Sequence, residues 1–314
     1  MMQRMDKTSL GLLIAFVVIS ALVFVIPNWA VFLGTLALAK GVVVIGLLVL
    51  WRTGLVSFGQ ALYFGMGGYA VGLVALKFGI SDAFILTLIA VVVSGITAML
   101  LGLIMARYRE IFFAMLSLAF SMILYGVLVK TEALGSTDGF NVVHPTYLGY
   151  APQEEAQRIS LFLWALFVAL ISTLGVQRYL RSTLGNLTSA IRDNEIRVEY
   201  LGVSVHRAIY FKYVIAGALT GAGGALTAMA VGHVDPEMTY WTTSGEFVFV
   251  TILSGTGNIA APFLGSIIFE LVRTYAFEYS PYTWQLVLGA VLLCLIMFLP
   301  NGLWSLVVKI KNRI

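Results

Sequence analysis

Two ionisable side chains, Lys40 and Glu270, interrupt long apolar stretches of this 314-residue sequence. A charge held unpaired in an apolar environment is costly, so each needs a partner or a water-filled cavity. The two lie at similar depth within their apolar stretches, and an ion pair between them would satisfy both. Arg273, one helical turn after Glu270, is a competing partner, and contacts with polar backbone groups are a third solution.

Two segments of the chain place glycines inside apolar sequence, residues 54–69 and residues 254–265. Irregular backbone at membrane depth is tolerated only where protein or water covers it, and such interruptions in both halves of a chain indicate a translocation path. The alternative is close helix packing through small residues, which we favour for Gly68–Gly72 and Gly217–Gly221. The predicted path residues are Ser57, Gly59, Gln60, Gly65, Gly68, Ser254, Gly255 and Gly257.

The longest polar stretch spans residues 182–206 and has the spacing of a short surface helix. Asp193 and Arg197 are spaced for an i,i+4 contact, and Gly202 is placed to end the helix. Its apolar residues are Leu187, Ile191, Val198 and Leu201. Such a helix could dock into a groove of a partner protein, and an ordinary solvated loop explains it equally well.

The sequence lacks the motifs of an enzyme. It contains no GxxxxGK[ST], GxSxG or HExxH pattern, so no nucleotide, nucleophile or zinc site is indicated. One cysteine and three isolated histidines give no disulfide framework and no metal spacing. A net charge of +4, spread along the chain, does not indicate nucleic-acid binding. We expect no cofactor or metal on this chain.

Composition identifies an integral membrane protein, because 60% of the residues are hydrophobic and only 11% are charged. We predict an all-α single domain over residues 1–314 with about ten transmembrane helices. The predicted spans are Leu10–Ile26, Val31–Leu50, Leu55–Leu76, Phe84–Ala106, Ile111–Val129, Leu161–Tyr179, Arg207–Val231, Phe247–Ser254, Phe263–Phe277 and Trp284–Leu299. The eighth is a short crossing interrupted at Gly255, Gly257 and Pro262.

Basic residues orient these spans. They cluster at one set of span ends, including residues 178–207 and the C-terminal tail, whereas acidic residues gather at the other. Both termini are therefore predicted to be cytoplasmic, in a multi-pass protein of the lipid bilayer. The external loop, about residues 130–159, contains a predicted turn made by Gly135, Ser136, Asp138 and Gly139.

Four motifs, in this order along the chain, resemble the LivM-type permeases of branched-chain amino acid ABC importers. They are GLVSFGQALYFGMGGYAVGL, ALGSTDGFNVV, SAIRDNEIRVEYLGVSV and WTTSGEFVFVTILSGTGNIAAPFLGSIIF, and the closing PNGLW is similar to the family's usual end. The resemblance covers residues 51–304, nearly the whole chain.

The resemblance implies a ten-helix fold like that of vitamin-B12 importers, with two halves related by inverted topology. It implies a bacterial inner-membrane location and four kinds of partner. These are a second homologous permease, two cytoplasmic ATPase subunits that hold ATP and Mg²⁺, a periplasmic solute-binding protein and the lipid bilayer. The family's coupling helix, which sits on the ATPase, matches Arg192, Asp193, Asn194, Glu195, Arg197, Leu201 and Gly202.

The chain departs from the family pattern at three places near the expected path. Ser254–Gly255 stands where a Gly-Gly pair is common, Ala261–Pro262 where Gly-Pro is usual, and Lys40 where an apolar or small residue is expected. The substrate therefore stays open between branched-chain amino acids and the urea, short amides or aromatic acids that relatives carry. A stand-alone channel or ion-coupled carrier that uses Lys40 and Glu270 is the alternative function, and a membrane-embedded enzyme is a weaker third.

Overall fold

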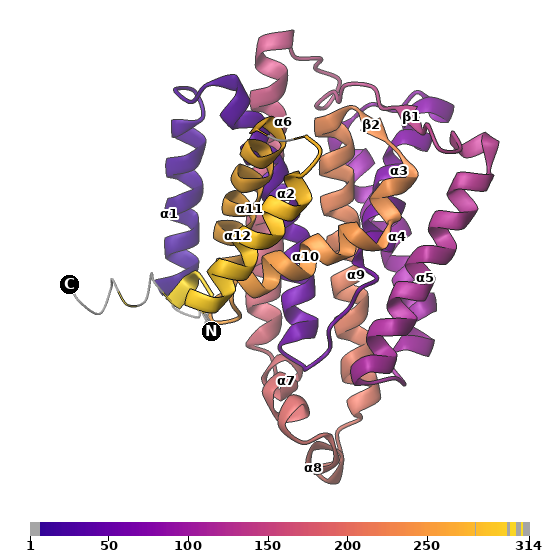
Figure 1. The fold of residues 1–314 in the computed structure, drawn as a ribbon, viewed down its shortest axis with the longest axis vertical. Coiled ribbons are helices and arrows are strands. Elements are labelled where there is room, and N and C mark those ends of the chain that lie inside the picture. Colours follow the sequence, from indigo (N-terminus) through magenta and orange to yellow (C-terminus); the bar gives the residue numbers. More distant parts are fainter. Residues whose placement is uncertain (1–6, 280, 300–301, 306–308, 310–314) are drawn as a thin grey trace.

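The computed structural model describes residues 7–279, 281–299, 302–305 and 309, and its helices form one bundle (Figure 1). The helices are α1 (Lys7–Leu22), α2 (Asn28–Trp51), α3 (Gln60–Phe78), α4 (Ala83–Met105), α5 (Glu110–Lys130), α6 (Glu154–Leu180), α7 (Thr183–Asp193), α8 (Glu195–Tyr200), α9 (Val205–Val231), α10 (Trp241–Ser254), α11 (Ala261–Tyr279) and α12 (Trp284–Phe298). Two 3₁₀ turns, η1 (Glu132–Leu134) and η2 (Pro236–Thr239), and two short antiparallel strands, β1 (Phe140–Asn141) and β2 (His233–Val234), complete the described elements.

Helix α9 forms the centre of the bundle and packs against α2, α3 and α4. Small residues allow this approach, because a Cβ added at Gly224 would collide with the carbonyl oxygen of Phe64 on α3. A Cβ at Gly67 would meet the backbone of Gly221 in the same way. The predicted packing role of Gly217 is confirmed, since it contacts Ala98. Most of the glycines within α3 and α9 thus set helix distances.

Six helices are long and apolar enough to cross a membrane: α2, α3, α4, α5, residues Ala156–Leu180 of α6, and α9. The remaining predicted spans correspond to α1, α10, α11 and α12. Three of these have 16, 14 and 15 described residues, and α11 carries Glu270, Arg273 and Glu278. The part of the chain that the structure describes therefore confirms an all-α, multi-pass protein, and the count of ten stays a prediction.

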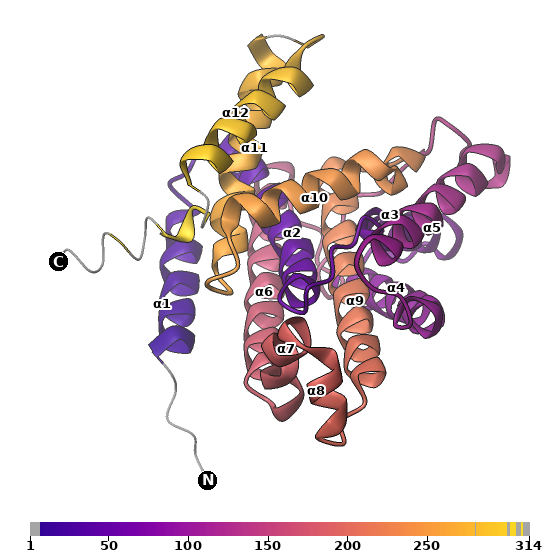
Figure 2. The same ribbon diagram turned by 60° about the horizontal axis from the view of Figure 1, so that its bottom comes forward.

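Several predicted span boundaries differ from the helix ends, and the starts of α3 and α10 are the differences that bear on the site. Helix α3 begins at Gln60, five residues after the predicted start at Leu55, because the backbone of residues 52–59 is irregular. Helix α10 begins at Trp241, six residues before the predicted Phe247, and runs across the bundle towards α11 (Figures 1 and 2). The interruption does fall at Gly255–Gly257, but Pro262 lies in the first turn of α11, where a missing N–H does no harm.

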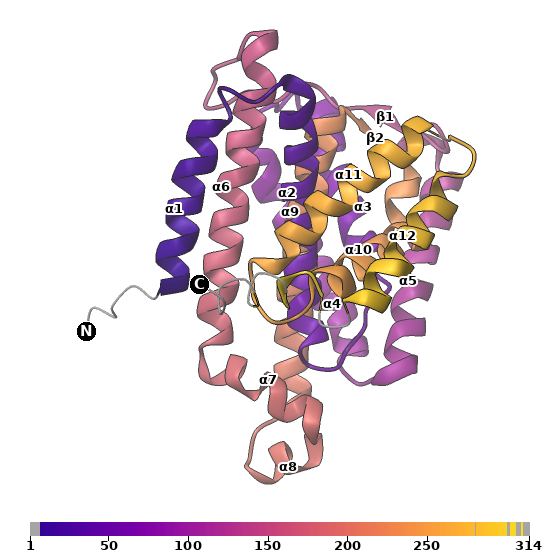
Figure 3. The ribbon, with the colours of Figure 1, turned by 60° about the vertical axis from the view of Figure 1, so that its left-hand side comes forward.

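The two ends of the bundle carry different structures (Figures 1 and 3). One end, called the hairpin end here, carries η1, β1 and β2. The other end carries α7 and α8, which project beyond the long helices. The first residue of α1 and the last residue of α12 lie closer to this α7–α8 end than the opposite ends of those helices do.

The outer surface of the long helices is apolar. Helices α4 and α5 present many large exposed hydrophobic side chains, among them Leu88, Leu103, Ile111, Phe112 and Ile123. Contiguous exposed apolar surface on this scale is typical of contact with lipid or with another subunit. Buried polar side chains lie between the helices, so the polarity pattern is that of a membrane bundle.

We predict that Gly224→Ala destabilises the bundle, since the new methyl group collides with the Phe64 carbonyl. Overpacking of this kind costs about 1–3 kcal/mol, and the melting temperature in detergent measures it. Gly126→Ala on α5 is the matched control, because a Cβ there meets nothing within 4 Å. Equal melting temperatures for the two variants would contradict this account of helix spacing.

Candidate functional site

A cavity of about 780 Å³ lies between α2, α9, α10 and α11. It reaches from Trp29 and His233, near the hairpin end, to Lys40 in the middle of α2. Its apolar wall includes Phe32, Leu36 and Phe277. The lining also carries charged side chains, including Arg158, Asp235 and Glu237 towards the hairpin end. A cavity of this volume has the dimensions of a small-molecule site.

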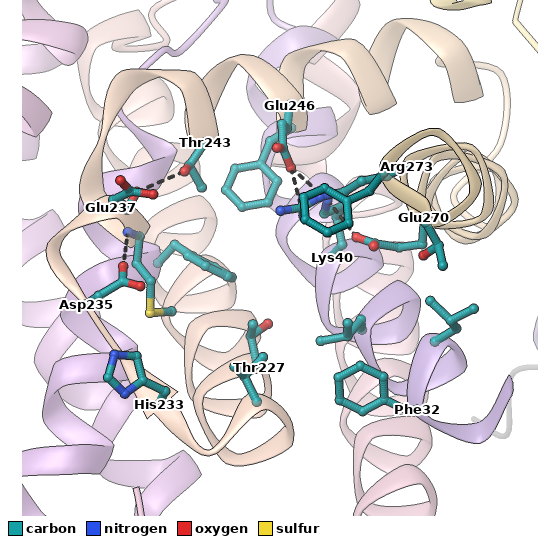
Figure 4. Close-up of a pocket in the computed structure, with 18 of the residues that line it drawn as sticks. Phe32, Lys40, Thr227, His233, Asp235, Glu237, Thr243, Glu246, Glu270 and Arg273 are labelled. Atoms are coloured by element: carbon teal, nitrogen blue, oxygen red, sulfur yellow. Dashed lines mark hydrogen bonds and ion pairs between the residues drawn. The ribbon is translucent and has the colours of Figure 1, made fainter. Parts of the chain in front are cut away.

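Four charged side chains meet in this cavity and are called the ion network here: Lys40, Glu246, Glu270 and Arg273 (Figure 4). The Lys40 Nζ lies 2.7 Å from Glu270 Oε1 and donates to Glu246 Oε2 at 2.9 Å. Arg273 Nη1 donates to the same Glu246 oxygen at 3.5 Å. The network thereby joins α2, α10 and α11, and of the solutions left open by the sequence the Lys40–Glu270 pair is the one present.

Burial in the ion network is graded. The side chains of Lys40 and Glu270 are 9% and 6% exposed, whereas that of Arg273 is 43% exposed. Lys40 Nζ also lies 4.1 Å from the centroid of the Phe269 ring, where the ring face attracts a cation. Arg273, proposed from spacing as a competing partner of Glu270, bonds to Glu246 instead. The buried pair and the half-exposed arginine therefore have different surroundings.

Sequence reasoning missed two charged residues inside the bundle. Glu246 lies one residue before the predicted span Phe247–Ser254, because the polar run Thr242–Glu246 conceals the first turns of α10. Lys212 lies inside the predicted span Arg207–Val231 and is fully buried, yet it was not noted as an intramembrane charge. Its Nζ has no hydrogen-bond partner among the described residues. Marking every charge more than one turn inside a span would have found Lys212.

Polar groups towards the hairpin end of the cavity hold the local backbone. Asp235 accepts a hydrogen bond from the Met238 N–H at 3.3 Å and so caps η2. His233 Nδ1 lies 3.0 Å from Asn141 Oδ1 across the β1–β2 pair. The backbone carbonyl of Glu237 accepts a hydrogen bond from the Thr243 hydroxyl at 3.0 Å. These contacts hold the backbone that connects β2 and η2 to the start of α10.

The predicted path residues of the first broken segment do not line this cavity. Ser57 and Gln60 are fully buried, and Gln60 Oε1 accepts a hydrogen bond from the Thr220 hydroxyl at 2.7 Å. Gly59 contacts Ser117 of α5, whose hydroxyl accepts the Phe58 N–H. The other two residues, Gly65 and Gly68, approach η2 at Thr239 and Met238. The role of these residues in a path stays a prediction.

The second broken segment, with Ser254, Gly255 and Gly257, lies between α10 and α11. Arg52, at the end of α2, donates two hydrogen bonds to the Thr256 carbonyl oxygen, at 3.2 and 2.7 Å. Gly255 has a φ of 78°, which favours glycine, and its backbone lies against Gly302. The segment is thus tied to α2 and to the C-terminal part of the chain.

The predicted coupling segment forms two helices, with Asn194 between them. Asn194 Oδ1 accepts the Arg197 N–H at 3.0 Å and caps α8. The predicted Asp193–Arg197 contact within one helix was wrong, because this break separates the two residues and Asp193 lies 3.6 Å from Arg192. Glu195 pairs with Arg109 at 2.6 Å. Gly202, with a φ of 81°, follows the end of α8 as expected.

Apolar residues of the coupling segment divide into two sets. Ile191 and Val198 are buried against the bundle, and Leu187 is partly buried with them. Ile196, Tyr200 and Leu201 are 64%, 87% and 78% exposed. Leu201 therefore lies apart from the buried Val198 side chain, and the second set is largely exposed.

The predicted turn at Gly135–Gly139 is present at the hairpin end. The N–H groups of Asp138 and Gly139 both donate to the Gly135 carbonyl oxygen, at 3.2 and 3.0 Å. The Ser136 hydroxyl donates to the Val129 carbonyl at 2.7 Å, which ties the turn to α5. Gly135 and Gly139 both have positive φ, so the turn needs glycine at these positions.

We predict opposite effects for methionine at the two buried lysines. Lys40→Met removes the cation shared by Glu246 and Glu270 and should lower the free energy of unfolding by about 3–5 kcal/mol. Lys212→Met removes a buried ammonium group that has no hydrogen-bond partner among the described residues. This substitution should raise the free energy of unfolding by about 1 kcal/mol. Melting temperatures in detergent at neutral pH measure both, with exposed Lys77→Met as control. A Lys40→Met variant as stable as the parent would show that the network is not held by its lysine.

Comparison with known proteins matches residues 25–296 to the family described as "Branched-chain amino acid transport system / permease component". The chain is 26% identical to the high-affinity branched-chain amino acid transport system permease protein LivM of Salmonella typhimurium, over 95% of this chain and 75% of that protein. It is 26% identical to LivM of Escherichia coli, over 98% and 78% of the two chains.

A probable branched-chain amino acid transport permease protein LivM from Methanocaldococcus jannaschii is 24% identical, over 80% of this chain and 85% of its own. No solved structure matches the chain significantly. The family match covers most of the sequence, including the helices that carry the ion network. The chain therefore belongs to the family of branched-chain amino acid transport permease components.

Proposed function

We propose that this chain is the membrane translocation subunit of an ATP-driven ABC importer for branched-chain or related small amino acids. Membership of the permease family supports the transport role, and the printed names of its relatives support the substrate class. The LivM relatives are permease subunits of transport systems, not enzymes.

The observation that carries the proposal is the exposed apolar face of α8. Helix α8 projects from the bundle at its α7–α8 end (Figure 3). Ile196 and Tyr200 of α8, and Leu201 directly after it, are largely exposed. Large apolar side chains on a short projecting helix are suited to a groove on a partner protein. The salt bridge between Glu195 and Arg109 ties the same helix to the start of α5, so a force on α8 would reach the long helices.

The partners in this proposal are a second homologous permease subunit, two ATPase subunits that bind ATP and Mg²⁺, and a periplasmic solute-binding protein. The exposed apolar faces of the long helices leave room for a second permease as well as for lipid. Because this chain lacks a P-loop motif, the ATP site is assigned to another chain.

We place the α7–α8 end in the cytoplasm of a bacterium and the hairpin end outside the inner membrane. Arg107, Arg109, Arg178, Arg192 and Arg207 lie at or near the α7–α8 end, in keeping with the excess of positive charge on cytoplasmic loops. We propose that α1, α11 and α12 also cross the membrane, and that α10 with the interruption at Gly255–Gly257 forms the short, broken crossing. There are then ten crossings, arranged as two inverted halves, and both termini are cytoplasmic.

Transport would proceed by alternating access. ATP binding would draw the ATPase subunits together and move α7 and α8, and the glycine-interrupted segments would let α3 and α10–α11 change their tilt. Arg52, which bonds to Thr256 in the second interrupted segment, links that segment to α2. The ion network joins the same helices at mid-depth, so the two connections would respond to one movement.

We predict that replacing Tyr200 and Leu201 together with serine disconnects the ATPase. The two side chains are exposed, so the bundle should fold as before while ATPase subunits no longer co-purify and ATP-driven leucine uptake into proteoliposomes falls at least tenfold. Replacing Leu148 and Tyr150 with serine at the hairpin end is the matched control, since these residues are 85% and 65% exposed. That control should keep the ATPase bound.

The charged residues of the same segment give a second form of the test. Replacing Arg192, Asp193 and Glu195 together should abolish uptake while the chain still inserts into the membrane. Unchanged uptake in both sets of variants would refute the coupling role. Leucine flux in liposomes that lack any ATPase, lost in Lys40→Met, would instead support an ion-coupled carrier built on the ion network.

A further inference from the structure

The cavity between α2, α9, α10 and α11 contains charged groups of both signs next to an apolar wall. Two cations and two carboxylates form the ion network, so its ionised side chains sum to zero charge. Phe32 and Leu36 of α2, with Phe277 of α11, lie along the same cavity. A ligand that fits must therefore satisfy both signs of charge and cover apolar surface.

The bonds of the ion network are unequal. Lys40 holds Glu270 and Glu246 at 2.7 and 2.9 Å, whereas Arg273 reaches Glu246 only at 3.5 Å. A 3.5 Å contact lies outside the range of strong charge-assisted hydrogen bonds. A ligand carboxylate can therefore replace Glu246 as the partner of Arg273 at the smallest cost in free energy, while Lys40 and Glu270 stay paired.

The two groups of this weak contact also face the cavity. The side chain of Arg273 is 43% exposed and that of Glu246 is 20% exposed, more than the 9% and 6% of Lys40 and Glu270. Within the described residues, the bonds from Lys40 and Arg273 converge on one oxygen of Glu246, Oε2. The other oxygen is left to accept from a ligand.

We propose that this cavity binds the zwitterionic head of an α-amino acid with an apolar side chain. The Arg273 guanidinium takes the ligand's carboxylate in a forked contact, and Glu246 accepts from its ammonium. The ligand's side chain lies against Phe32, Leu36 and Phe277. The inference rests on the proposed transport function and locates its substrate within this chain.

The same geometry disfavours ligands that carry one charge. A cation without a carboxylate would leave Arg273 without its Glu246 contact, and an anion without an ammonium would face Glu246 and Glu270. The first ligand leaves Arg273 without a carboxylate partner, and the second leaves Lys40 alone to balance Glu246 and Glu270. Either ligand therefore leaves an excess charge in the ion network, which penalises binding. The site therefore predicts selection for the zwitterion.

Three probes test this selection on the full chain assembled with its wild-type partner subunits in nanodiscs, without ATP. They are L-leucine, leucinamide, which lacks the carboxylate, and 4-methylpentanoate, which lacks the ammonium. Isothermal titration measures binding and the melting temperature gives an independent reading. Leucine should bind and raise the melting temperature, and the other two should bind at least tenfold more weakly. Equal binding of all three, or none by leucine, would overturn the proposal.

Substitutions in this chain test whether leucine binds in the cavity. Arg273→Gln and Glu246→Gln should each weaken leucine binding at least tenfold, the loss expected for one charged hydrogen bond. Arg273→Lys keeps the positive charge but cannot make the two-bond contact of a guanidinium, so it should bind leucine with intermediate affinity. This variant replaces Arg273→Gln in the test if the glutamine variant does not fold. Lys77→Gln, exposed at the end of α3, is the control. Unchanged affinity in both glutamine variants would place the leucine elsewhere and overturn the proposal.

The outcome is separable from that of the transport proposal. Leucine binding that depends on Arg273 and Glu246, with no ATP-driven uptake, would support the site and refute the importer. ATP-driven uptake with binding unaffected by these residues would do the reverse.

Discussion

The burial of Lys40 is the constraint on which the centre of this molecule depends. An ammonium group inside an apolar bundle must be neutralised, and here two carboxylates from α10 and α11 do so at 2.9 and 2.7 Å. These helices are less apolar or shorter than the six clear spans, so their position owes more to this contact. The same contact leaves Arg273 at the edge of a cavity with an apolar wall.

Close packing around α9 supplies the second requirement. Glycines at the contacts with α2, α3 and α4 bring backbones together, as between Gly224 and Phe64. This part of the bundle is therefore closely packed, and the charged cavity lies where α10 and α11 meet α2 and α9. The interrupted segments lie at its edge, where Arg52 donates to the Thr256 carbonyl oxygen and the Ser117 hydroxyl accepts from the Phe58 N–H. The closely packed helices around α9 and the helices α10 and α11 are joined by polar contacts. Two groups of helices connected in this way are suited to alternating access.

Sequence alone predicted the parts of the fold that depend on composition. Apolar runs located α2, α4, α5, α6 and α9, and glycines at positive φ marked the turn at Gly135 and the end of α8. The start of α10 was missed, since Ser244 and Glu246 make its first turns polar although both face inward. Depth along two spans suggested the Lys40–Glu270 pair. The cavity itself, and the roles of Glu246 and Arg273 in it, depend on how three separate helices are placed, which spacing along one helix does not specify.

On the proposed importer mechanism α10 and α11 change their tilt, so the cavity that they form with α2 and α9 should change its shape during ATP-driven transport. Thr227 of α9 and Thr243 of α10 both line it, and spin labels at these positions report its width by electron-electron distance measurement. Cys294 is exposed on α12 and is first replaced by serine. In the assembled complex, the distance distribution should shift between the nucleotide-free state and the state trapped with ATP and vanadate. An identical distribution in both states, in a complex that still takes up leucine, would contradict the account.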